Sequence, residues 1–257
     1  MSAATTVAIH LTFARAIIIG FIQGVTELFP ISSLGHSVLL PALFGWHDLV
    51  KSQSASESAY LAFLVGLHVA TALALLGFFW HDWVEIITGL VLLGGERLRR
   101  RSDVPAVAGS VGPDGAGPQP RAAEPARRLD SLNYREGFII GLFQSTALLA
   151  GISRSGVTMV GGLLRGLDHE DAARFSFLAA TPAILGAGLL KVPDLTGHLG
   201  DGIRGQVLAG SLAAAVGALI SVRFLMKYFE TRTLTPFGIY CVVVGTVCAI
   251  GFGTGIF

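Results

Sequence analysis

Charged side chains are scarce in this chain. Only 14% of its 257 residues are Asp, Glu, Lys or Arg, whereas 52% are hydrophobic, and the mean hydropathy is +0.67. These values are typical of a protein with several membrane spans and exclude an ordinary soluble domain. The formal net charge is only +1, so the chain lacks the basic surplus expected of a protein that binds nucleic acid.

Cysteine is equally scarce, and the start of the chain lacks a basic segment. Cys241 and Cys248 share one face of an apolar helix, which favours buried thiols over a disulfide or a metal pair. No cleavable signal peptide is expected, because the first apolar stretch has no basic start and continues into polar residues.

Four apolar segments are long enough to cross a membrane as helices, which takes about 20 residues. They are 59–80, 173–191, 206–224 and 236–257. Two further regions each combine a longer and a shorter apolar piece, namely 7–29 with 37–46 and 132–150 with 156–166. Turns rich in Ser, Gly and Pro join these pieces, so each pair is predicted to form a re-entrant hairpin.

The segment 96–130 separates the two hairpin regions and differs from them in composition. It is rich in Pro, Gly and Ala and carries seven arginines, which indicates a disordered linker. Its arginines place it in the cytoplasm by the positive-inside rule, and the basic loop 223–232 agrees. When the spans are counted from the linker, the two hairpins are predicted to enter the membrane from opposite faces. The segment 82–95 is predicted to be an interfacial helix.

A short pattern recurs in the two hairpin regions. Residues 18–23 (Ile-Ile-Gly-Phe-Ile-Gln) return as 139–144 (Ile-Ile-Gly-Leu-Phe-Gln), and an Ile-Ser pair follows each glutamine at the same spacing. Internal repeats in membrane proteins often build one site at the repeat interface. We predict an all-α polytopic membrane protein with two inverted repeats. Its single membrane domain, 1–257, would consist of repeat one (7–95), the linker and repeat two (131–257).

The first copy carries groups that can exchange protons. Gln23 and Glu27 are four residues apart and share a helix face, and a carboxylate within the membrane indicates a functional site. A structural hydrogen bond to the other repeat is the alternative role for Glu27. After Pro30 ends the helix, Ser33 and His36 are near enough for a hydroxyl and an imidazole to meet, as an activated nucleophile requires.

The second copy carries groups that can bind an anion. Residues 151–158 read Gly-Ile-Ser-Arg-Ser-Gly-Val-Thr, a glycine-flanked turn that opens a helix with free N–H groups. Arg154 adds a guanidinium fork suited to phosphate oxygens, with extension to the membrane interface as the alternative. Together the copies favour phosphoryl transfer over ion conduction. His68, within 59–80, could line the site or form a helix–helix hydrogen bond.

These motifs resemble those of the bacterial undecaprenyl-diphosphate phosphatases, also called bacitracin-resistance proteins. The resemblance covers nearly the whole chain. The similar family patterns are (Glu/Gln)-x-x-x-Glu at 23–27, Pro-x-Ser-Ser-x-Gly-His at 30–36 and Gly-x-Ser-Arg-Ser-x-x-Thr at 151–158. The resemblance implies a hydrolase that converts undecaprenyl diphosphate to undecaprenyl phosphate and inorganic phosphate. This reaction recycles the lipid carrier for peptidoglycan and confers bacitracin resistance.

The resemblance assigns roles to the polar residues of both copies. Ser33 would be the nucleophile, Glu27 and His36 would activate it or transfer protons, and Arg154 would hold the diphosphate. The pocket would be lined by Gln23, Ser32, Ser153, Ser155 and Thr158. Glu27 and His36 could equally serve a route in which Ser33 positions a water molecule.

The resemblance also implies a cofactor, partners and a location. The cofactor would be a divalent cation, Mg²⁺ or Ca²⁺, with Glu27 as its expected ligand. The partners would be the polyprenyl diphosphate and membrane lipids, with bacitracin competing for the substrate and no nucleic acid involved, and the chain could form a homodimer. The site would face the periplasm from the bacterial plasma membrane.

The chain departs from the family pattern at a few positions. Gln23 replaces the more usual glutamate, which weakens a metal site built on two carboxylates. Ala150 and Leu34 stand where proline and threonine are common, and neither change removes a reactive group. Typical members also have additional spans before the linker. A transporter or flippase of a polyprenyl phosphate is the alternative function, because inverted repeats with broken helices also build transporters.

Overall fold

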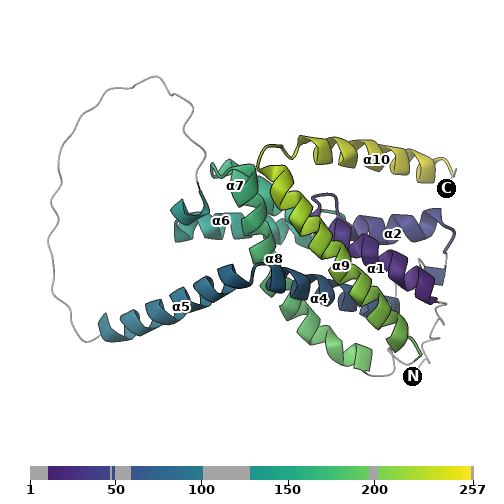
Figure 1. The fold of residues 1–257 in the computed structure, drawn as a ribbon. Coiled ribbons are helices and arrows are strands. Elements are labelled where there is room, and N and C mark those ends of the chain that lie inside the picture. The colour runs from purple at the N-terminus through teal and green to yellow at the C-terminus, as the bar shows by residue number, and fades with distance from the viewer. Residues whose placement is uncertain (1–10, 47, 50–58, 101–127, 197–201, 256–257) are drawn as a thin grey trace, which may run out of the picture. The chain divides into compact units, whose positions relative to one another are not determined.

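The computed structural model describes residues 11–46, 48–49, 59–100, 128–196 and 202–255, and all their secondary-structure elements are helices (Figure 1). This confirms the predicted all-α class. The chain divides into two compact units, one drawn from 1–78 and 127–257 and the other from 79–126. Parts of three predicted segments lie outside the described residues, namely 7–10, 101–127 and 256–257.

Two pairs of short helices occupy the positions of the sequence repeat. The first pair is α1 (Phe13–Leu28) with α2 (Ser33–Leu43), and the second is α6 (Tyr134–Ser145) with α7 (Arg154–Leu164). The Ser32 side chain accepts the Gly35 N–H at 3.2 Å, and the Ser153 side chain accepts the Gly156 N–H at the same distance. The repeated serine therefore caps the second helix of each pair.

Four helices of the first unit are long and apolar enough to cross a membrane. They are α4 (Ala59–Phe78), α8 (His169–Thr196), α9 (Arg204–Phe229) and α10 (Thr235–Gly253). They confirm the four predicted spans. α8 and α9 begin before, and run beyond, the apolar segments 173–191 and 206–224, because backbone hydrogen bonding continues into the polar residues at both ends.

α1 crosses α9 at close range because small residues line the contact. A Cβ atom added to Gly20 would collide with the backbone of Gly210, and one added to Gly24 would collide with the backbone of Ala214. Membrane helices favour such contacts, since a missing side chain lets two backbones approach. This crossing sets the position of α1, and with it the polar residues of its last two turns.

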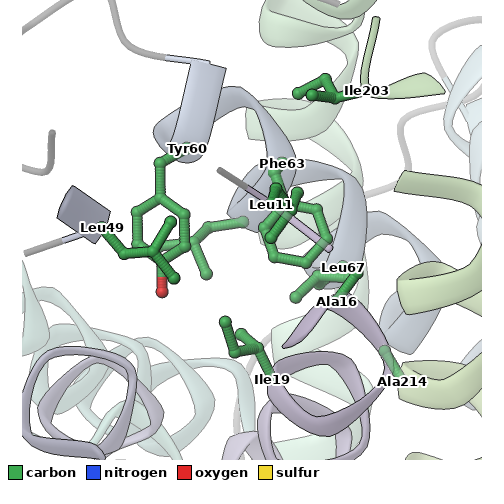
Figure 2. Close-up of a cluster of buried hydrophobic side chains, with 10 residues drawn as sticks. Leu11, Ala16, Ile19, Leu49, Tyr60, Phe63, Leu67, Ile203 and Ala214 are labelled. Atoms are coloured by element: carbon green, nitrogen blue, oxygen red, sulfur yellow. The ribbon is translucent and has the colours of Figure 1, made fainter. Parts of the chain in front are cut away.

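An apolar cluster holds α1 against α4 as well. Figure 2 shows side chains from the start of α1 facing those of α4, with one residue of α9 beside them. The labelled members from these three helices are Ala16, Ile19, Tyr60, Phe63, Leu67 and Ala214. All six are buried, so α1 is enclosed on two sides.

α8 connects the two helix pairs. It packs against α4, where Ala72 contacts Ala180 and Ile184, and it also packs against α7. On the α7 side, Gly162 lies close to Ala172 at the start of α8. The second pair is therefore joined through α8 to the helix that encloses α1.

Helical residues extend into both ends of the predicted linker 96–130. In the second unit, α5 (Trp80–Arg100) is one continuous helix that covers the predicted interfacial helix 82–95 and continues beyond it. In the first unit, Leu129–Ser131 form the short 3-10 helix η1, which is held because the Leu129 N–H donates to the Asp171 carboxylate at 2.8 Å. The interfacial location of 82–95 stays a prediction.

Both cysteines are free thiols, but their predicted burial is wrong. Cys241 is exposed and Cys248 is half-buried on α10. The reason is that most side chains of α10 are exposed, although Phe237 and Tyr240 near its start contact other described helices, so the apolar face expected to be core is largely uncovered.

Candidate active site

A polar cavity of about 200 Å³ lies where the turns of the two helix pairs meet. Its walls come from the α1–α2 turn, from α4, and from the segment between α6 and α7. Its polar lining residues are Glu27, Ser32, Ser33, His68, Ser153 and Arg154. Both copies of the repeat thus contribute to one cavity, and His68 of α4 completes it.

The Glu27 carboxylate is the centre of the hydrogen bonding in this cavity. Its Oε2 accepts from the Ser33 hydroxyl at 2.5 Å and from the Gln23 amide at 2.9 Å. Its Oε1 pairs with the Arg154 guanidinium, which comes from the other copy of the repeat. Glu27 is buried, and a buried carboxylate needs partners of this kind to stay charged. It forms the predicted bond to the other repeat while also holding the nucleophile candidate.

His68 approaches the same carboxylate from α4. Its Nε2 is 3.2 Å from Oε2 of Glu27 and 3.0 Å from the Gln23 amide nitrogen, while Nδ1 is 2.7 Å from the Leu64 carbonyl oxygen. Because a carbonyl only accepts, Nδ1 carries a proton, and Nε2 is the atom that faces the site. The structure gives His68 both of the roles left open, because it lines the cavity and also contacts Gln23 and Glu27 of α1.

The turn between α1 and α2 places Ser33 beside Glu27. Ser32 has a φ of 68°, a left-handed value that is uncommon outside glycine. This conformation reverses the chain, so the first residue of α2 returns to the last turn of α1. Strained backbone of this kind tends to occur at functional sites, where the surrounding structure holds it.

Arg154 is the first residue of α7, and its guanidinium crosses to the first copy of the repeat. Besides Glu27, it contacts the Ala180 carbonyl oxygen of α8 at 3.5 Å. Ser153, which caps α7, lines the cavity beside it. The arginine therefore faces the site, and the alternative in which it extends to the membrane interface is not observed.

The structure does not bring His36 and Ser33 together. His36 Nδ1 lies 2.8 Å from the Ser32 carbonyl oxygen, and Nε2 lies 2.8 Å from the Tyr240 hydroxyl on α10. Ser33 is turned toward α1, whereas His36 faces α10, although both lie in the first turn of α2. Sequence reasoning missed Tyr240, because an isolated tyrosine in an apolar helix carries no local signal.

Three other predicted site residues support the cavity without lining it. Gln23 lies buried beneath Glu27, and Ser155 donates to the Phe29 carbonyl oxygen at 3.2 Å, which ties α7 to the α1–α2 turn. Thr158 donates to the Arg154 carbonyl oxygen at 2.8 Å within α7. Of these contacts, the Ser155 bond joins the two turns, and contact of the three residues with substrate stays a prediction.

The donor set of the cavity fits a metal ion only in part. Glu27 is the single carboxylate among its lining residues, and its oxygens already bind the groups described above. Across the described ranges, no group of three or more His, Cys, Asp or Glu side chains could hold a metal ion. Mg²⁺ commonly binds through one or two carboxylates together with substrate phosphates. The residues therefore suit a cation that is bound chiefly by a phosphate substrate.

Comparisons with known proteins agree with the chemistry of the cavity. Residues 16–111 and 115–247 match the model of the family "Bacitracin resistance protein BacA". The chain is 45% identical to undecaprenyl-diphosphatase 2 of Frankia alni, over 95% of this chain and 98% of that protein. It is 48% identical to the undecaprenyl-diphosphatase of Mycolicibacterium paratuberculosis, over 92% of this chain and 96% of that protein. All polar residues that line the cavity fall within the matched ranges.

Proposed function

The chain belongs to the bacitracin resistance protein family and has the undecaprenyl-diphosphatase activity for which its relatives are named, and we propose that the polar cavity performs this reaction. One observation carries the proposal, namely the 2.5 Å hydrogen bond from Ser33 to Glu27 beside the Arg154 guanidinium. A hydroxyl, its base and a cation within one cavity are the groups that phosphoryl transfer to a serine needs.

Ser33 is the nucleophile in this proposal. Its Oγ forms a bond to the terminal phosphorus while its proton passes to Glu27, and the bond from that phosphorus to the bridging oxygen breaks. Undecaprenyl phosphate leaves with the bridging oxygen. Water then attacks the phosphoserine, which releases inorganic phosphate and restores the hydroxyl. Trapping a phosphorylated Ser33 would distinguish this route from one in which Ser33 positions a water molecule.

Arg154 has a different partner before and after substrate binds. Without substrate it pairs with Glu27, which holds the carboxylate charge and weakens its basicity. An entering diphosphate competes for the guanidinium, because phosphate oxygens match its planar fork. Glu27 is then a stronger base toward Ser33, while Arg154 stabilises the charge on the phosphoryl oxygens.

The ends of two helices add to the binding of the diphosphate. α2 and α7 both begin at the cavity, since Ser32 and Ser153 cap them and line its wall. Helix N-termini favour anions through their free N–H groups and their dipoles. His36 positions the start of α2 through the Ser32 carbonyl oxygen instead of exchanging a proton with Ser33.

A divalent cation, Mg²⁺ or Ca²⁺, is part of the proposal. The diphosphate oxygens would supply most of its ligands, and Glu27 is the lining carboxylate that could complete them. When bound, the cation would neutralise charge on the phosphates. The geometry of this cavity otherwise assigns proton transfer and phosphate orientation to the residues of the chain.

The protein is a multi-pass membrane protein of a bacterial family, and we propose that both helix pairs are re-entrant and that the cavity faces the periplasm. The arginine-rich segment 96–130 would then be cytoplasmic. The test is a cysteine introduced into this segment in a variant that lacks Cys241 and Cys248. An impermeant thiol reagent should label it only after the membrane is opened, and labelling in intact cells would overturn this orientation.

The decisive test of the reaction is phosphate release from undecaprenyl diphosphate by the purified protein, with and without Mg²⁺. Ser33→Ala and Arg154→Ala should each abolish release. Ser145→Ala, an exposed serine of α6 that does not line the cavity, is the matched control and should keep full activity. Phosphate release that survives in both site variants would overturn the proposed site, whereas no release by the unmodified protein would favour the transporter alternative.

A further inference from the structure

A second cavity, apolar and larger, adjoins the polar one. Its volume is about 460 Å³, and it lies between the second helix pair, the turn after α1 and the start of α10. Its apolar lining residues include Phe143, Val157, Val160, Leu234 and Phe237. Ser153 lines both cavities, so they share a wall at the serine that caps α7.

We propose that this apolar cavity binds the first isoprene units of the polyprenyl diphosphate. The inference rests on the proposed placement of the diphosphate beside Ser33 and Arg154. The prenyl chain begins one oxygen beyond the phosphate that is not attacked, so it must leave the polar cavity close to the head group. The wall at Ser153 is where an apolar space lies next to the polar one.

The size of the cavity limits what it can hold. Its volume falls within the range of about 300–1,000 Å³ that is typical of small-molecule sites. Such a volume accommodates a few isoprene units and not a whole undecaprenyl chain, so the distal part of the lipid would stay in the bilayer. The cavity therefore recognises the part of the chain that is nearest to the phosphates.

The energetic role of this cavity differs from that of an apolar pocket in a soluble enzyme. A lipid in the bilayer is already out of water, so entering the cavity brings no hydrophobic gain, and association depends on van der Waals packing. Phe143 and Phe237 offer flat rings to a branched, unsaturated chain, and Val157 and Val160 offer methyl groups. The fit should act on the KM for the lipid and leave the chemical step unchanged.

Gly238 lines the cavity on its α10 side, next to Phe237. A Cβ atom at Gly238 would meet no heavy atom of the described chain within 4 Å, so a larger side chain there would enter the cavity without a clash. By contrast, a Cβ atom at Gly156 would lie 3.3 Å from Ser153 and 3.4 Å from Pro30. Gly156 is therefore needed for packing, whereas Gly238 can be changed to fill the cavity.

The test compares Gly238→Leu with Gly245→Leu. Gly245 lies on the same helix with equally open surroundings, but it does not line the cavity. Steady-state hydrolysis of undecaprenyl diphosphate and of farnesyl diphosphate would be measured for both variants. Gly238→Leu should raise the KM for both lipids about tenfold with kcat unchanged, while Gly245→Leu should match the unmodified protein. Val160→Phe narrows the cavity from α7 and should repeat the effect if Gly238→Leu does not fold.

Several outcomes would overturn the proposal. An unchanged KM in Gly238→Leu and Val160→Phe would show that the prenyl chain does not enter the apolar cavity. If the thermal stability of these variants changed as well, the cavity would be assigned to a bulk membrane lipid instead. An equal rise in Gly245→Leu would point to a general effect on α10. Ser33→Ala separates this inference from the proposed reaction. If that variant is inactive while Gly238→Leu keeps its KM, only the lipid site is wrong, whereas an active Ser33→Ala contradicts the reaction itself.

Discussion

The two helix pairs share a sequence pattern but differ in what surrounds their first helices. Gly20 of α1 lies against the backbone of Gly210 on α9, whereas its repeat counterpart Gly141 on α6 has no neighbour within 4 Å of an added Cβ in the described chain. α1 packs against both α4 and α9, whereas α6 packs chiefly against α7, its partner in the second pair. The repeated pattern therefore specifies a helix followed by a capped turn, and a neighbouring helix determines whether the glycine is buried.

This difference matches the division of chemistry between the pairs. Glu27, the carboxylate that lines the cavity, belongs to the pair whose first helix packs against both α4 and α9. A buried charge requires partners in fixed positions, because each lost partner leaves a desolvation cost uncompensated. Arg154 has a long side chain and reaches the site from the less enclosed pair. The predictions below test this asymmetry.

The largest loss of phosphate-release rate is expected for a change of Glu27, where the two helix pairs meet. Glu27→Gln removes the base of Ser33 and the partner of Arg154 while keeping the shape of the side chain. The rate of phosphate release should fall by at least about a hundredfold, the usual scale for losing a general base. The matched control is Glu230→Gln at the exposed end of α9, which should keep its rate. A rate within a fewfold of the unmodified protein would exclude Glu27 as the base.

The second prediction compares the repeat-equivalent glycines directly. Gly20→Ala places a methyl group against the Gly210 backbone and should destabilise the fold by about 1–3 kcal/mol, as overpacking does. Gly141→Ala meets open space and should stabilise α6 by roughly 0.5–1 kcal/mol, because alanine favours the helix. Unfolding of both variants in detergent measures the difference. Equal effects would refute the asymmetry between the pairs.

The third prediction concerns the support of Glu27 from α4. His68→Ala removes the imidazole beside Oε2 and should lower kcat about tenfold, the scale of a hydrogen bond to a charged group. The KM should not change, since His68 acts through Glu27 and not through the lipid. His68→Gln offers a new donor and should restore most of the rate. A loss of stability with an unchanged kcat would make His68 a structural residue only.

The smallest loss of phosphate-release rate is expected for a change of Tyr240, which lies outside the polar cavity. Tyr240→Phe removes the hydrogen bond to His36 while keeping the ring, which stacks on the imidazole with centroids 5.9 Å apart. The rate should fall about threefold or less, the scale of one neutral hydrogen bond. A loss as large as that of Glu27→Gln would show that His36 takes part in proton transfer after all.

The features that depend on short stretches of chain could be predicted. The four spans follow from apolar length. The serine caps were not predicted, although a hydroxyl three residues before a free N–H group is a local signal for them. The polar motifs 23–36 and 151–158 were also identified as one site. Their residues stand out because polar groups between apolar helices are costly to bury and therefore indicate a function. The ends of α5 and η1, which extend a few residues into the predicted linker from either side, were not predicted.

The sequence by itself determined which residues were available for chemistry, and the tertiary structure determined which of them meet. Spacing along α2 suggested that Ser33 pairs with His36, but the left-handed turn at Ser32 directs Ser33 to Glu27 instead. The pairing of Arg154 with Glu27 and the position of His68 depend on how α1, α4, α7 and α8 pack. Local rules such as helix length and capping act over a few residues, whereas contacts between distant segments depend on the packing of the whole fold.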